Sequence, residues 1–108
     1  MKFSIVFFNA TVQERLTAWP VGIYASFIRI SEQIVESGPN LGMPYTKAMG
    51  KGLFEIRARG VEGIGRAFFC CVKDHKIVIL HSFIKKTQTT PVKELQIAQK
   101  RMKEVYRD

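Results

Sequence analysis

Six charged or titratable side chains on strand-like segments could act together on a phosphate. They are Glu55, Arg57, Arg66, His81, Lys85 and Lys86. Attack of an RNA 2′-hydroxyl on its own phosphate needs a base, an acid for the leaving oxygen, and cations for the charge that develops on phosphorus. His81 and Glu55 could move the protons, and the cations could stabilise the charge. Since the substrate supplies the nucleophile, this chemistry needs neither a metal ion nor a cofactor.

Each of these side chains also has a simpler interpretation. A single histidine near the end of an apolar strand, such as His81, is more often a core or turn residue. Arg57 could form a cross-strand ion pair, and Lys85 and Lys86 could be ordinary surface charge. The sequence has no nucleophile elbow, no glycine-rich phosphate loop before a helix and no metal-binding spacing of His, Cys and Asp. The spacing alone leaves RNA cleavage and a structural role both open.

Composition predicts one folded domain, residues 1–108, that binds a polyanion. The chain is 46% hydrophobic and carries a net charge of +8. Residues 1–40 hold three basic and three acidic residues, so residues 41–108 hold 14 of the 17 basic and six of the nine acidic ones. Such a one-sided surface favours nucleic acid or an acidic partner protein. No apolar run approaches the ~20 residues of a membrane span, so we expect a cytoplasmic protein without membrane contact.

The elements that must position these side chains follow in the order β-α-α-β-β-β-α. The expected strands are residues 2–8, 53–59, 65–73 and 76–84, and the expected helices are residues 12–19, 20–37 and 92–106. Asn9 or Thr11 could cap the first helix. The last three strands have short connections and predict an antiparallel meander. We therefore expect an α/β (α+β) fold, with two N-terminal helices packed on a mainly antiparallel sheet.

Three segments carry more specific expectations. Residues 40–52 are rich in glycine and predict an irregular connection, in which Tyr45 and Lys47 could stack on a base and bind phosphate, or simply link two elements. Residues 53–59 alternate strictly, which places Glu55 and Arg57 on one charged face. The last helix has a stripe predicted to be buried, made of Val92, Leu95, Gln99, Met102 and Tyr106. The adjacent Cys70 and Cys71 are expected to be buried, reduced thiols.

Five segments together carry a resemblance to a known family. They are residues 41–47, 52–57, 65–69, 79–91 and 94–101, and the run LHSFIKKTQTTP at residues 80–91, ahead of a basic helix, is the most specific. The chain resembles the RelE/HigB toxin superfamily, most closely the phage-derived HigB-like toxins of type II toxin–antitoxin systems, over roughly residues 3–107. The resemblance implies a RelE/ParE-like toxin fold and a ribosome-dependent mRNA endonuclease, or mRNA interferase, that inhibits translation.

The resemblance also implies site residues and partners. The catalytic residues would be Arg57, Arg66, His81 and Lys85, and the RNA-binding residues Tyr45, Lys47, Phe83 and Lys86. The implied partners are the ribosome, mRNA and a helix-turn-helix (HigA-like) antitoxin, with operator DNA reached only through the antitoxin complex. Some RelE-like enzymes use a tyrosine near the C-terminus, but Tyr106 fits the predicted buried stripe, and we expect it to pack.

Two other functions are compatible with this fold. A DNA gyrase inhibitor of the ParE type shares the fold and binds protein instead of cleaving RNA, and fold alone cannot separate the two. A phage protein that binds nucleic acid without catalysis is the other alternative. The cluster of His81, Lys85 and Lys86 favours cleavage, because a gyrase inhibitor needs no such cluster.

Overall fold

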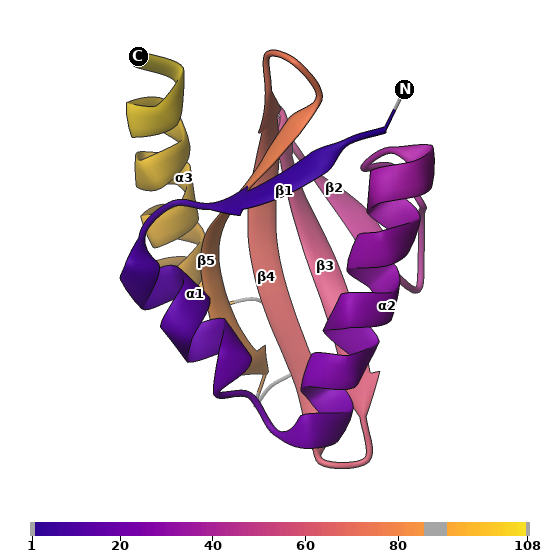
Figure 1. Cartoon of the computed structure of the whole chain (residues 1–108). Coiled ribbons are helices and arrows are strands. Elements are labelled where there is room, and N and C mark those ends of the chain that lie inside the picture. Colours follow the sequence, from indigo (N-terminus) through magenta and orange to yellow (C-terminus); the bar gives the residue numbers. More distant parts are fainter. Residues whose placement is uncertain (1, 86–90, 108) are drawn as a thin grey trace.

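The computed structural model describes residues 2–85 and 91–107, which form one sheet with helices on both faces (Figure 1). The elements in chain order are β1 (Ser4–Phe7), α1 (Ala10–Thr17), α2 (Val21–Ser37), β2 (Thr46–Gly50), β3 (Leu53–Gly60), β4 (Gly63–Val72), β5 (Lys76–Lys85) and α3 (Val92–Arg107). The described strands have the spatial order β1-β5-β4-β3-β2. Only the β1–β5 pairing among them is parallel. The predicted α+β class is confirmed.

The structure contains one strand, β2, that the predicted element order did not include. Residues 40–52 were expected to be irregular, but β2 pairs antiparallel with β3, with Thr46 opposite Ile56. The turn between the two strands uses Gly50, Lys51 and Gly52, all with positive φ values. The glycines therefore build a hairpin turn, a position where their conformational freedom is needed, and do not exclude regular structure.

The two N-terminal helices form much as predicted. Asn9 caps α1, because its side chain accepts a hydrogen bond of 2.9 Å from the backbone N–H of Val12. Helix α2 follows Pro20 and ends before Gly38. Its predicted apolar face is confirmed, since Ile23, Phe27, Ile30 and Ile34 are all buried.

Alternate strand residues supply two cores, one on each face of the sheet. Phe69, Ile77 and Ile79 pack with α1 and α2 in the first core. Their neighbours Phe68 and Val78 pack with α3 in the second. Because successive strand residues point to opposite faces, β4 and β5 are covered on both sides (Figure 1). This rigid centre fixes the positions of the charged side chains on the same strands.

The buried stripe predicted for α3 is partly wrong. Ala98 and Met102 are buried, but Val92 is 67% exposed and Tyr106 is 51% exposed. The middle turns of α3 pack against β4 and β5, while its first and last turns lie at the margins of the sheet (Figure 1). Tyr106 is held there by a hydrogen bond of 3.0 Å from its hydroxyl to the carbonyl oxygen of Cys71.

No helix in the described part of the chain combines the length and apolar character required to cross a bilayer.

Candidate functional site

Arg57 and Arg66 lie directly opposite each other on β3 and β4. Like charges in that position repel, and the carboxylate of Glu55 lies between them. Arg66 Nη1 is 3.2 Å from Glu55 Oε2, and Arg57 Nε is 4.0 Å from Glu55 Oε1. Glu55 and Arg66 are buried, whereas the Arg57 side chain is 22% exposed. The three side chains, which we call the arginine triad, keep a net positive charge, and Arg57 is its most accessible member.

The arginine triad changes the roles open to Glu55. The sequence allowed it to be a proton carrier, but its side chain is only 1% exposed and faces two guanidinium groups. A carboxylate so enclosed is not placed to exchange a proton with substrate. The alternative interpretation of Arg57 as half of an ion pair is seen in the structure, with the partner on its own strand.

His81 is buried and already paired. Its Nε2 lies 2.8 Å from Glu94 Oε1, in the first turn of α3, and only 6% of the residue is exposed. On the sheet it lies opposite Phe68, and Phe68 lies opposite Glu55. His81 therefore lies on the strand beside that of Arg66 and two strands away from Glu55 and Arg57. Its role as acid or base stays a prediction, and the core interpretation describes the geometry seen here.

Phe83 and Lys85 occupy the last part of β5. Phe83 pairs with Arg66, so it belongs to the same cross-strand row as Arg57. Its ring packs 5.8 Å from that of Phe68 and is half-buried. The backbone of Lys85 lies opposite Ile64, which in turn lies opposite Arg59. Lys86 lies outside the described residues.

Tyr45 and Lys47 both lie beside the arginine triad. The carbonyl oxygen of Tyr45 accepts a hydrogen bond of 2.9 Å from the backbone N–H of Arg57, and Tyr45 is 46% exposed. Lys47 on β2 is exposed and lies opposite Glu55. The structure therefore brings Tyr45, Lys47, Arg57 and Arg66 together from three separate parts of the sequence.

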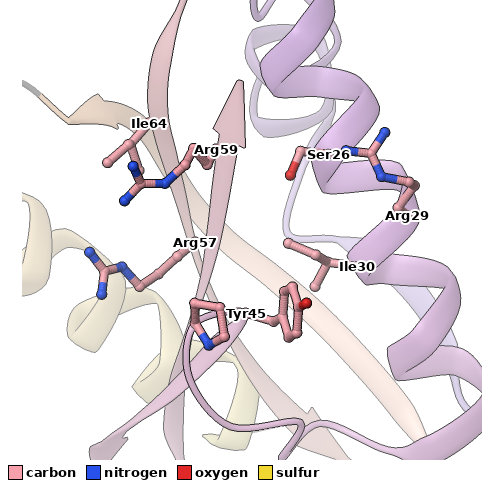
Figure 2. Close-up of a pocket in the computed structure, with 8 residues that line it drawn as sticks. Ser26, Arg29, Ile30, Tyr45, Arg57, Arg59 and Ile64 are labelled. Carbon is pink, nitrogen blue, oxygen red and sulfur yellow. The ribbon is translucent and has the colours of Figure 1, made fainter. Parts of the chain in front are cut away.

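A groove with a volume of about 280 Å³ opens between α2 and β3 at this end of the sheet (Figure 2). The groove is lined by Ser26, Arg29, Ile30, Pro44, Tyr45, Arg57, Arg59 and Ile64. Arg29 and Arg59 are exposed, and neither forms an ion pair with another described residue. We call this feature the arginine groove.

Sequence reasoning missed both Arg29 and Arg59 as site residues. The alternation of β3 had placed Arg59 on the same face as Arg57, so a signal existed. Arg29 gave none, because a polar residue away from the apolar face of a helix is ordinarily solvated.

The other reactive groups of the chain lie away from this site. Burial raises the pKa of the Cys70 thiol to about 11, and burial also raises the pKa of Cys71. Burial therefore disfavours the thiolate, the nucleophilic form, of both side chains. Partial burial raises the pKa of the Tyr106 hydroxyl. This hydroxyl donates its hydrogen bond to the carbonyl oxygen of Cys71, near the end of β4 that lies away from Arg66. No three His, Cys, Asp or Glu residues within the described ranges are grouped to bind a metal ion.

Comparison with known proteins places the chain in a family. Residues 14–103 match the model of the family described as phage derived protein Gp49-like. The chain belongs to this Gp49-like family. No significant match is found among curated protein sequences.

A solved structure shows the same fold as this Gp49-like chain. It is the archaeal RelE–RelB complex from Pyrococcus horikoshii OT3, with 22% sequence identity and a TM-score of 0.56. The match covers 78% of this chain and 96% of that one. The expected membership of the RelE superfamily is confirmed at the level of family and fold. The narrower HigB assignment stays a prediction.

Proposed function

We propose that this Gp49-like chain is the toxin of a type II toxin–antitoxin module and cleaves mRNA on the ribosome. Two kinds of observation support the proposal. The fold is that of RelE, and the arginine triad sets two guanidinium groups side by side where β5 brings Lys85 to the same end of the sheet. That arrangement is the observation that carries the proposal, because phosphoryl transfer requires preorganised positive charge.

The proposed reaction is attack of a 2′-hydroxyl on the adjacent phosphate. A bond forms between O2′ and phosphorus, the bond from phosphorus to the 5′ oxygen breaks, and one proton moves from O2′ to the leaving oxygen. Arg57 would contact the phosphate, because it is the accessible arginine of the triad. Arg66 is buried and would act by fixing Glu55 and Arg57. Lys85 would share the charge of the transition state.

The remaining predicted residues have supporting roles in this proposal. Tyr45, Lys47, Phe83 and Lys86 would bind the RNA chain. His81 would move a proton only after its contact with Glu94 opens, because in this structure its Nε2 is occupied.

The proposal includes an inhibitory partner. The similar RelE structure was solved as a complex with RelB. By this analogy we propose that an antitoxin, of the helix-turn-helix HigA type, neutralises the chain and links it to operator DNA in the cytoplasm. The net charge of +8 favours an acidic surface on that partner.

Primer extension on mRNA from cells that briefly express the chain tests the proposed activity. We expect new 5′ ends within translated regions, lost or reduced at least tenfold in Arg57→Ala and in Lys85→Ala. Arg15→Ala removes an exposed arginine of α1 and serves as the charge-matched control, which should cleave like the parent. Growth arrest with intact mRNA would point to a gyrase inhibitor, and no effect on growth or mRNA to a non-catalytic binding protein.

A further inference from the structure

We propose that the arginine groove is a subsite for one unpaired RNA nucleotide, with its base against Tyr45 and its flanking phosphates on Arg29, Arg57 and Arg59. This inference rests on the proposed function for its substrate class, RNA. It adds a nucleotide-binding subsite and assigns Arg29 and Arg59, which have no role in the reaction described above.

The charge of the groove points to a phosphate-bearing ligand. Arg29 comes from α2, and Arg57 and Arg59 come from β3, so three arginine residues line the groove. The side chains of Arg57 and Arg59 extend to the side of β3 that faces away from α2, so the positive charge of the groove lies on both sides of that strand (Figure 2). Glu55 is shared with Arg66 and lies 4.0 Å from Arg57, and no carboxylate lines the groove. Guanidinium groups bind phosphate oxygens in a planar, bidentate geometry. The groove therefore has positive charge that the described residues leave uncompensated.

The uncharged part of the lining points to a base. Tyr45 is 46% exposed at the edge of the groove, with Ile30 beside it (Figure 2). Pro44 is a further apolar residue of the lining. Aromatic side chains in single-strand binding sites stack on bases of any identity. The apolar neighbours of Tyr45 would exclude water from the face of the base that does not contact the ring. A volume of about 280 Å³ is of the size occupied by a single small ligand.

The position of the groove favours RNA over an acidic peptide. Arg57 belongs both to the groove and to the arginine triad. An RNA strand with one phosphate bound at the triad would therefore place its neighbouring nucleotide in the groove. A peptide would satisfy the guanidinium groups but would leave the exposed ring of Tyr45 without a planar partner.

Fluorescence anisotropy with a labelled single-stranded 2′-O-methyl oligoribonucleotide tests the subsite without cleavage, because this probe lacks the attacking hydroxyl. We expect Tyr45→Ala to weaken binding about five- to hundredfold and Tyr45→Phe to bind like the parent. Arg29→Ala and Arg59→Ala should each lower the slope of log affinity against log salt by about 0.7. Arg15→Ala, with the same change in charge, should leave the slope close to that of the parent.

The outcomes separate this inference from the proposed function. If the Tyr45, Arg29 and Arg59 variants bind RNA like Arg15→Ala, the subsite is refuted, even where the parent cleaves mRNA in cells. If those variants keep RNA binding and lose binding of a polyglutamate peptide, the groove is a protein site and the inference is also refuted. Loss of RNA binding in the variants supports the subsite, whether or not the parent cleaves mRNA.

Discussion

At the scale of single residues, the arginine pair depends on one buried carboxylate. Glu55→Ala would remove the carboxylate that lies 3.2 Å from Arg66, whose side chain is buried at 5% exposure. Removal of one partner from a buried ion pair costs about 3 kcal/mol or more. We expect a loss of that size in the free energy of unfolding, measured by urea denaturation.

The exposed ion pair between Lys2 and Glu36 provides the control for this prediction. Its side chains are 72% and 61% exposed, and such pairs contribute between 0 and about 1 kcal/mol. Lys2→Ala should therefore change stability little. Equal losses in the two variants would mean that Glu55 does not hold the arginines together.

The positions of individual site residues were predictable from sequence, and their environments were not. Strict alternation in β3 correctly placed Glu55 and Arg57 on one face, because that pattern depends only on local backbone geometry. The burial of Glu55 depends on Arg66, which belongs to another strand. The pairing of His81 with Glu94 joins β5 to α3. No local sequence pattern predicts this contact, because its two residues belong to different elements.

At the scale of elements, the hairpin between β3 and β4 holds the start of α2. The backbone N–H of Gly22 donates a hydrogen bond of 2.9 Å to Glu62 Oε2 in the turn of that hairpin. A Cβ atom at Gly60 would lie 2.5 Å from the backbone nitrogen of Ile23, so the approach requires glycine. This contact fixes the distance between α2 and β3, and with it the width of the arginine groove.

The contact of Glu62 with α2 should make stability depend on pH. Hydrogen bonds from backbone N–H groups, that of Gly22 foremost, lower the pKa of Glu62 below its ordinary value of 4.5. A lowered pKa in the folded state stabilises the fold above pH 4.5, and this stabilisation is lost as the pH falls through the folded pKa. Glu62→Gln should therefore have a lower Tm than the parent at pH 7, and the difference should close at strongly acidic pH.

Glu32→Gln is the matched control for the Tm measurement. It removes a carboxylate from the exposed surface of α2, the helix that Glu62 contacts. It should show no comparable difference at pH 7. A gap between Glu62→Gln and the parent that stays constant down to pH 3 would contradict the assigned role of the carboxylate.

Element prediction failed where tertiary context decided the outcome. The three helices and four of the described strands had periodic or cap signals. Strand β2 had none, because residues 46–50 show no alternation and the strand exists through its pairing with β3. For α3 the helical stripe was read over its full length, but the sheet covers only its middle turns, which leaves Tyr106 half exposed.

At the scale of the whole molecule, β1 completes the sheet at its far margin. Ser4–Phe7 pairs with residues 76–79 of β5, and Phe3, Ile5 and Phe7 pack against the core of α1 and α2. Removal of residues 1–8 would expose that edge and the apolar surface beneath it. We expect the shortened chain to lose its cooperative thermal transition, followed by circular dichroism.

Fragment complementation supplies the control for this prediction. Addition of a peptide of residues 1–9 should restore the transition, whereas a peptide of the same composition in scrambled order should not. A shortened chain that unfolds as cooperatively as the parent would show that β1 is dispensable.

The parallel pairing of the first and last strands also has a consequence for synthesis. Ser4 lies beside Lys76 in the sheet, so β1 cannot pair with β5 until the ribosome has made residues 76–79. Contacts between such distant residues form late, because a long loop must close first. The hairpin of β3 and β4 can form early, but the sheet closes only when β5 has left the ribosome. The complete sheet therefore exists only after residues 4–85 have all been synthesised and have emerged from the ribosome.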